Sequence, residues 1–137
     1  LTGSSLSLKI PFLEKEEAKE KEAAERIAKI NAIEGLNEIK AAIAEHELYH
    51  DEFNAAMERG DGRLPVRPES NIGEMKIKYP RAAAYLKAEN YEYSANYAQA
   101  SAGRKARERI INGEDYEQVL ADMEKEWSDY CNEHVWD

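Results

Sequence analysis

The stretch Leu36-Asn-Glu-Ile-Lys-Ala-Ala-Ile-Ala-Glu-His-Glu-Leu-Tyr-His-Asp-Glu-Phe-Asn-Ala-Ala-Met57 decides the fold class. Its apolar residues and its two histidines recur in steps of three and four, which places them on one face of an α-helix. The alternation is typical of a coiled-coil-like seam, so the stretch predicts a helix that packs lengthwise on other helices. The members of this seam are Leu36, Ile39, Ile43, His46, His50, Phe53 and Met57.

The same periodicity extends over most of the chain and predicts an all-α protein. We expect one domain over residues 1–137, built as an elongated antiparallel bundle of three to four helices. The predicted segments are a flexible or strand-forming start over 1–12, a helical stretch over 13–59 that is continuous or broken near Gly35, a loop over 60–79, and helices over 80–112 and 114–135. Alternating apolar residues also allow a minor two-stranded pairing of residues 6–10 with 75–79. The predicted core contains Leu36, Ile39, Ile43, Phe53, Met57, Leu86, Leu120, Met123 and Trp127.

Composition narrows the class of protein. The chain is 42% hydrophobic and 34% charged with few Gly or Pro, which favours a helical domain over a disordered segment. A single cysteine, Cys131, excludes an internal disulfide and indicates a reducing cytoplasm. The longest uncharged apolar run is far shorter than the ~20 residues that a membrane helix needs. We therefore expect a cytoplasmic protein that does not enter membranes.

Charge is distributed unevenly along the chain, whose net charge is −9. Residues 14–61 hold 14 acidic and 7 basic residues, residues 62–113 hold 5 and 10, and residues 114–137 hold 9 and one. One account is internal, because a basic middle segment can pack between two acidic ones. The other account is an acidic outer surface that docks on a basic partner. The sequence is compatible with both.

The acidic segments support the leading hypothesis, a non-enzymatic helical protein that binds another macromolecule with a basic surface. One version is a nucleic-acid-mimic inhibitor from a phage or mobile element, in which carboxylates imitate phosphates. Direct nucleic-acid binding is not expected, since the acidic flanks repel phosphates. A structural homo-oligomer, such as a dimer through the long helix, is an alternative. The candidate partner-binding residues are Glu114, Asp115, Glu117, Asp122, Glu124, Glu126 and Asp129.

The pentapeptide His46-Glu-Leu-Tyr-His50 matches the H-E-x-x-H pattern of zinc hydrolases. Histidines four residues apart on a helix can hold one Zn²⁺, and Glu47 would act as general base on the metal-bound water. A third ligand is required, with Glu89, Glu92 or His134 as candidates. The competing interpretation is two half-buried imidazoles of the seam, hydrogen-bonded to tyrosines or carboxylates. We expect no cofactor, or zinc if the protein is such a hydrolase.

Two short patches resemble proteins of mobile elements. The segment Glu92-Tyr-Ser-Ala-Asn-Tyr-Ala98 resembles the Glu-rich ligand helix of a metalloprotease family common on mobile elements, which implies Glu92 as a metal ligand. Ser94 stands where that family has Glu. The segment Lys9-Ile-Pro-Phe-Leu-Glu-Lys-Glu-Glu-Ala-Lys19 resembles the strand-to-helix opening of a small accessory domain of such proteins, but Glu20–Ala23 departs from its continuation. Together the patches suggest a bacterial or phage origin.

Overall fold

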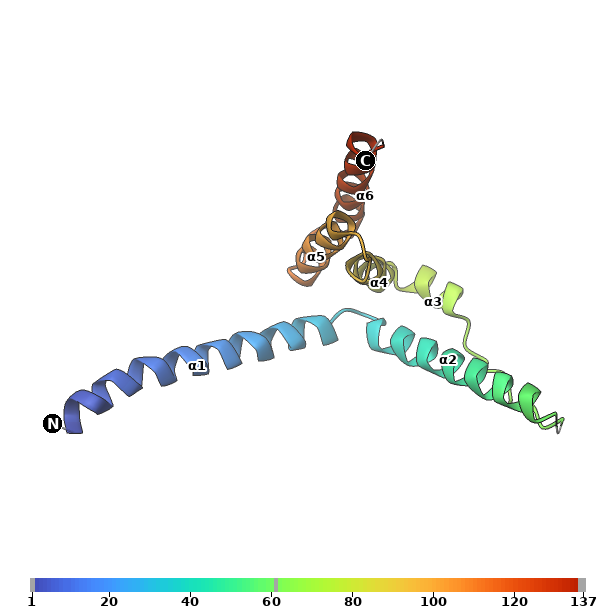
Figure 1. Cartoon of the computed structure of the whole chain (residues 1–137), viewed down its shortest axis with the longest axis horizontal. Helices are drawn as coiled ribbons and strands as arrows, with labels where there is room; N and C mark the ends of the chain where they lie inside the picture. Colours follow the sequence, from blue (N-terminus) through green and yellow to red (C-terminus); the bar gives the residue numbers. More distant parts are fainter. Residues whose placement is uncertain (1, 61, 136–137) are drawn as a thin grey trace. The chain divides into compact units, whose positions relative to one another are not determined.

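The computed structural model describes residues 2–60 and 62–135, with side chains from residue 11 onward. Every regular element in this described part is a helix, which confirms the all-α class (Figure 1). Residues 2–60 and 62–135 form six helices instead of the three or four that the sequence predicted. They are α1 (Thr2–Asn31), α2 (Leu36–Arg59), α3 (Ile72–Lys78), α4 (Pro80–Glu92), α5 (Tyr97–Ile111) and α6 (Tyr116–Glu133).

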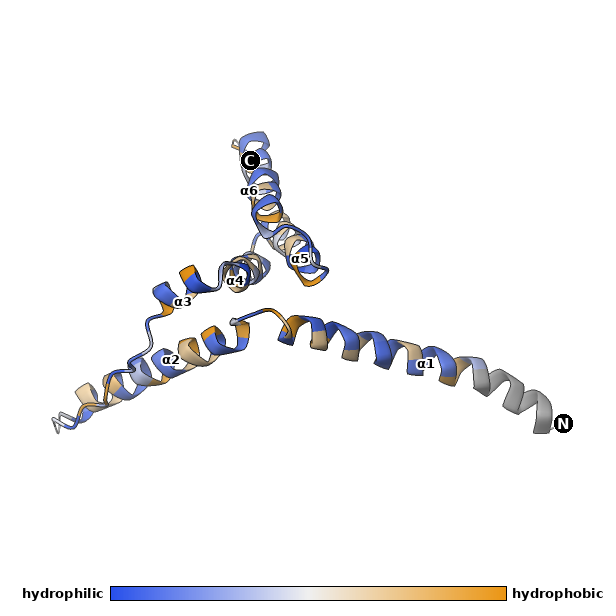
Figure 2. Cartoon of the chain, turned by 180° about the vertical axis from the view of Figure 1, so that it is seen from behind, coloured by the Kyte–Doolittle hydropathy of each residue, from blue (hydrophilic) through white to orange (hydrophobic). Residues whose placement is uncertain are grey.

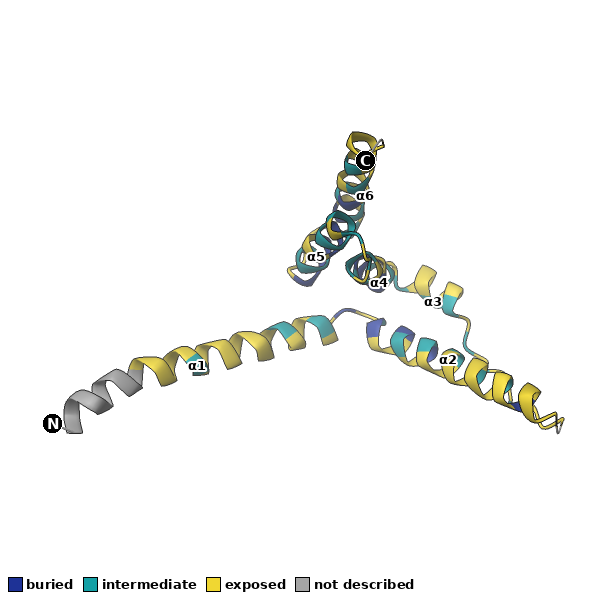
Figure 3. Ribbon diagram, viewed as in Figure 1, coloured by how far each residue is buried: buried dark blue, intermediate teal, exposed yellow. Residues whose placement is uncertain are grey.

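The chain divides into two compact units, residues 1–32 and residues 33–137, whereas the sequence predicted one domain. The first unit is α1 alone. Most of its described side chains are exposed, Phe12, Leu13 and Ile27 among them (Figure 3). Hydrophilic residues dominate the middle of α1 (Figure 2), and Lys19 pairs with Glu16 at 3.7 Å one turn away. None of the described side chains of α1 is buried, the apolar ones included, so these residues form no core of their own.

The expected flexible or strand-forming start and the two-stranded pairing are wrong for the described residues. Residues 2–12 belong to α1, and residues 75–78 belong to α3. Pro11 lies inside α1. A strand pairs only with another extended segment, and since residues 72–78 are helical, residues 6–10 have no extended partner there. Leu1 lies outside the described residues.

The break near Gly35 separates α1 from α2. Gly35 has φ 77°, a left-handed conformation that glycine adopts without steric cost. A Cβ atom at this position would overlap the ring of Tyr79. The Tyr79 hydroxyl donates a hydrogen bond to Glu38 at 3.2 Å, which ties the start of α2 to the junction between α3 and α4. The helical stretch predicted over 13–59 is therefore two helices.

The segment predicted as a loop over 60–79 is extended only in part. Residues 62–71, which we call the strap, run back along α2, where Ser70 bonds to His46 (Figure 1). Asn71 then ends the strap and begins α3, because its side chain accepts a hydrogen bond from the Glu74 amide at 3.1 Å. This local N-cap is the reason that the sequence-based loop assignment is wrong over 72–78. Asp61 lies outside the described residues.

The prediction of a single helix over 80–112 is also wrong, because the structure has two helices there, α4 and α5. The Asn96 side chain accepts hydrogen bonds from the amides of Ala98 at 2.9 Å and Gln99 at 3.3 Å and so begins α5. The two helices pack antiparallel at very short range around Gly103, where an added Cβ would lie 2.6 Å from Ala88 O. Small buried residues, Ala88, Ala102 and Ala106, permit this close contact between the two halves of the predicted helix.

The core of the second unit lies among α4, α5, α6 and the start of α2. Leu36, Ile39, Leu86 and Met123 are buried, as the sequence predicted. The other predicted core residues, Ile43, Phe53, Leu120 and Trp127, are half-buried, and Met57 is 62% exposed. The reason for Phe53 and Met57 is that the second half of α2 is covered by the strap instead of another helix. Its inward face is therefore only partly removed from water.

Candidate functional site

The carboxylates predicted to bind a partner lie on or beside α6, where most of them contact bases of the same unit. Arg109 of α5 pairs with Glu114 at 3.0 Å and with Asp122 at 2.8 Å. The hydrogen bond from Arg109, with a second one from Gln118, lowers the pKa of Asp122 below its ordinary value. The same bond to Asp122, with help from Glu114, raises the pKa of Arg109. This pair joins α5 to α6.

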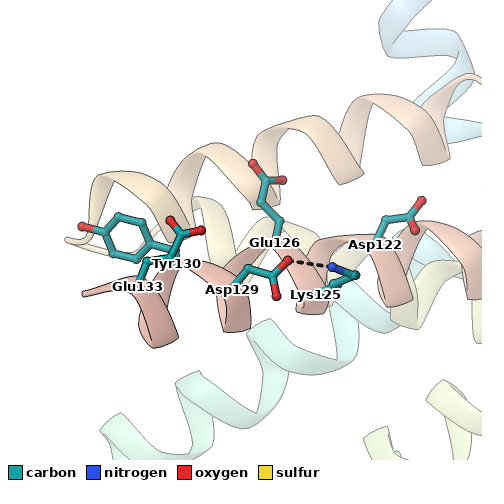
Figure 4. Close-up of a pocket in the computed structure, with 6 residues that line it drawn as sticks. All are labelled: Asp122, Lys125, Glu126, Asp129, Tyr130 and Glu133. Atoms are coloured by element: carbon teal, nitrogen blue, oxygen red, sulfur yellow. Dashed lines mark hydrogen bonds and ion pairs between the residues drawn. The ribbon is translucent and has the colours of Figure 1, made fainter. Parts of the chain in front are cut away.

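Three further ion pairs involve the same predicted set. Glu124 pairs with Lys87 of α4, Glu126 pairs with Lys105 of α5 at 2.7 Å, and Asp129 pairs with Lys125 at 2.7 Å (Figure 4). Asp115 accepts a hydrogen bond from the Glu117 amide at 3.3 Å and caps α6, and Glu117 is exposed. Five of the seven predicted carboxylates are thus engaged by bases, four of them by bases from 62–113. Basic residues of the middle segment therefore pair with acidic residues of the C-terminal segment, which is the first of the two arrangements that the charge pattern allowed.

Exposed carboxylates without such pairing lie on α2 instead. Within the described chain, the ion pairs involve none of the acidic residues in the second half of α2, and each of these residues is exposed. Exposed apolar side chains, Leu48 and Met57, stand among them. Three of these carboxylates, at spacings of four and seven, share one face of the helix, and we call this set the α2 acidic surface: Glu47, Asp51 and Glu58. These carboxylates were not among the predicted partner-binding residues, although their spacing is visible in the sequence.

The two histidines of the H-E-x-x-H pattern have different surroundings. His46 is half-buried, and its Nε2 lies 2.9 Å from the carbonyl oxygen of Ser70 and 3.3 Å from the Ser70 hydroxyl. A carbonyl oxygen only accepts, so Nε2 of His46 carries the proton. His50 is exposed, with its ring edge-on to Tyr49 at 5.5 Å, and Glu47 is exposed as well. His46 therefore bonds to Ser70 of the strap and not to the tyrosine or carboxylate that the sequence predicted.

The third zinc ligand that the sequence suggested does not lie beside these histidines. Glu92 contacts Arg107 at 2.7 Å and Arg104 at 3.7 Å between α4 and α5. The other candidates, Glu89 and His134, are placed elsewhere, because Glu89 pairs with Lys40 at 3.5 Å and His134 stacks on Tyr130 of α6 at 4.0 Å. In the described residues, no three His, Cys, Asp or Glu side chains gather as a metal ion requires.

A hollow of about 320 Å³ opens between α2 and the strap and contains both histidines. We call it the Arg67 hollow, and it is lined by His46, Tyr49, His50, Phe53 and Arg67. A second hollow adjoins it, lined by His46 and residues 67–72. Sequence reasoning missed Arg67. The signal that was available is Pro65-Val-Arg-Pro68, in which two prolines flank the arginine.

A third hollow follows the outer side of α6 and is lined by acidic residues with Lys125 and Tyr130 (Figure 4). Its carboxylates include the paired Asp122, Glu126 and Asp129, so most of its negative charge is already balanced. Among the described helices, none combines the length and the apolar character needed to cross a bilayer. No protein family, no curated protein and no solved structure matches the chain.

Proposed function

We propose that the protein is a non-enzymatic binding module that docks on a basic surface of a partner protein through the α2 acidic surface. The observation that carries the proposal is a contrast between two helices. Four of the six carboxylates of α6 are held by bases of α4, α5 and α6. In contrast, Glu47, Asp51 and Glu58 of α2 are exposed and take part in no ion pair of the described chain. Unpaired carboxylates attract a basic surface more strongly than paired ones.

The charge of the second unit supports the same partner chemistry. Residues 33–137 contain 22 acidic and 13 basic residues, a net charge of −9, while residues 1–32 contain six of each. The entire net charge of the chain thus belongs to the unit that carries α2. Leu48 and Met57 supply apolar contact area among the carboxylates, as protein interfaces require. Electrostatic attraction would increase the association rate, and salt would weaken it.

The spacing of the carboxylates along α2 bears on a more specific form of this proposal, in which the protein mimics nucleic acid. Residues Glu47, Asp51 and Glu58 are separated by four and seven positions, about 6 and 10 Å along the axis at ~1.5 Å per residue. Phosphates of one DNA strand follow each other every ~3.4 Å of helix axis. The α2 array is sparser than that, which favours a basic protein patch over a channel fitted closely to DNA. We further propose that the protein is an inhibitor of phage or mobile-element origin and that it acts in the cytoplasm.

A charge-reversal experiment tests the proposal. One variant carries Glu47→Lys, Asp51→Lys and Glu58→Lys on α2, and a matched control carries Glu14→Lys, Glu17→Lys and Glu25→Lys on α1, so both raise the net charge by six. Immobilised wild type and control should retain the same basic protein from an extract of the source cells, identified by mass spectrometry, and the α2 variant should lose it. Retention of that protein by the α2 variant would contradict the proposal.

A zinc-dependent hydrolase is the second candidate, supported by the position of His46 and His50 in one hollow. In this function the two imidazoles would bind Zn²⁺, Glu47 would be the general base, and Glu92 would have to leave its arginines. Elemental analysis of protein purified without added metal or a polyhistidine tag decides the matter. About one zinc per chain, lost in His46→Ala with unchanged circular dichroism, would favour the hydrolase hypothesis over the binding module.

A structural homo-oligomer is the third candidate, in which exposed helices such as α1 associate between copies. Light scattering at micromolar concentration measures the mass directly. A mass of one chain would exclude it, and a mass of two chains would support a homodimer.

A further inference from the structure

The Arg67 hollow has a lining that is opposite in character to the unit around it. Residues 33–137 hold 22 acidic residues against 13 basic ones, yet the hollow is lined by one arginine, two histidines and two aromatic rings, with no carboxylate among its described lining residues. Its volume of about 320 Å³ lies at the lower end of the roughly 300–1,000 Å³ range of small-molecule sites. A concave site without acids in an acidic unit is suited to a small anion.

Arg67 is held in place by its neighbours in the strap. Pro65 and Pro68 flank it and restrict the backbone on both sides. Two residues further on, Ser70 is bonded to His46 of α2, which anchors the strap beside the hollow. The Arg67 side chain is exposed, and none of the ion pairs within the described chain involves it. Its guanidinium is therefore available to bind a phosphate through two parallel hydrogen bonds.

The histidines add further polar contacts. Because Nε2 of His46 donates to the Ser70 carbonyl, the orientation of the ring is fixed. His50 is exposed in the same hollow, and its ring carries an N–H donor in either tautomer. The permanent positive charge of Arg67 in the same hollow opposes a cation there and favours an anion. The pair of histidines that resembles a zinc site thus lies in a setting better suited to phosphate.

The aromatic side chains of the hollow indicate which chemical group the bound anion carries. Tyr49 and Phe53 lie with their ring centroids 6.0 Å apart and inclined by 40°, and both are half-buried. Their partly exposed rings offer an apolar surface on which a flat ring can stack. We propose that the Arg67 hollow binds a small phosphate monoester carried on a flat aromatic ring, with a mononucleotide as the representative ligand. Arg67 holds the phosphate, and Tyr49 and Phe53 contact the base.

Calorimetric titration of the full chain tests this with three probes: adenosine 5′-monophosphate, adenosine, and inorganic phosphate. The monophosphate should bind at least tenfold more tightly than either fragment, because only it uses both the arginine and the rings. Arg67→Ala should weaken it on the order of tenfold or more, as expected for loss of charge-assisted hydrogen bonds. Arg63→Ala removes an equal charge from the strap outside the hollow and should change the affinity less than twofold.

A second variant separates binding from folding. Arg67→Lys keeps the charge but not the two parallel bonds, so it should bind the monophosphate more weakly than wild type and more tightly than Arg67→Ala. Circular dichroism checks that each variant keeps the helical content of the wild type. The proposal is overturned if adenosine monophosphate shows no saturable binding at millimolar concentration, if Arg67→Ala and Arg63→Ala bind it equally, or if adenosine binds as tightly as its monophosphate.

Discussion

Replacing Gly103 by alanine tests the contact between α4 and α5, on which the core of the second unit depends. A Cβ atom at this position would lie 2.6 Å from Ala88 O, from the amide nitrogen of Glu92 and from Cβ of Tyr91. Two of these three atoms belong to the α4 backbone, which cannot rotate away as a side chain can. The two helices must therefore separate, and the contact around the fully buried Tyr85 must loosen with them.

The size of the effect follows from two opposing contributions. Overpacking a tightly packed contact costs about 1–3 kcal/mol, and backbone atoms at 2.6 Å place Gly103→Ala at the upper end. Alanine recovers about 1 kcal/mol because it favours the helix interior more than glycine does. The net destabilisation should be about 2 kcal/mol. In a unit of this size such a loss lowers the melting temperature by roughly 8–15 °C.

Urea and thermal unfolding followed by circular dichroism at 222 nm measure the difference. Gly73→Ala is the matched control, since Gly73 also lies in a helix and a Cβ there would meet only Asn71 Oδ1 at 3.4 Å. The control should leave stability unchanged or raise it by less than about 1 kcal/mol. If Gly103→Ala is as stable as the wild type, the close approach of α4 and α5 is not what holds the unit together.

Three further predictions concern single residues. Gly35→Ala should destabilise the second unit by more than Gly113→Ala in urea unfolding, because both have positive φ but only Gly35 faces a side chain, the Tyr79 ring. Asp122 has a lowered pKa in the folded state, so the stabilisation from its pair with Arg109 is present near neutral pH and is lost as pH falls through that lowered value; in Arg109→Ala, carboxyl-carbon NMR should show Asp122 titrating at higher pH than in the wild type. Asn96→Ala removes the cap of α5 and should cost about 1 kcal/mol in urea unfolding, whereas Asn96→Asp should cost much less.

Helix content could be predicted because the signals for it are local. The three- and four-residue steps from Leu36 to Met57 correctly predicted a helix whose early members, Leu36 and Ile39, are buried. The break between α4 and α5 was not predicted, although Asn96 is a favourable N-cap residue. Helix-forming residues precede and follow Asn96, so the sequence was interpreted as one continuous helix. Close packing through Gly103 makes the antiparallel arrangement favourable, and this contact is invisible in the local sequence.

For the candidate sites too, local features could be predicted from the sequence, whereas contacts between distant segments could not. The spacing of His46 and His50 placed them on one helix face, and they do line one hollow. The sequence suggested Glu89, Glu92 or His134 as a third ligand beside them, but the structure places Arg67 there. Nothing in the spacing of a helix indicates which distant segment will cover its face. Here the cover is the strap, because Ser70 bonds to His46 from 24 positions away in the chain.

The sequence by itself determined that this chain is helical, that its charge is segregated along its length and that its middle segment is basic. Each of these properties follows from composition or from hydrogen bonds that join residues four positions apart. Only the tertiary structure decided which charges neutralise one another, with Arg109 held by Asp122 and Lys87 by Glu124 across different helices. It also decided that Glu47, Asp51 and Glu58 of α2 take part in no ion pair of the described chain and that Arg67 lies beside two histidines. The physical reason is that ion pairs and hollows depend on how helices and strap pack, which no local pattern records.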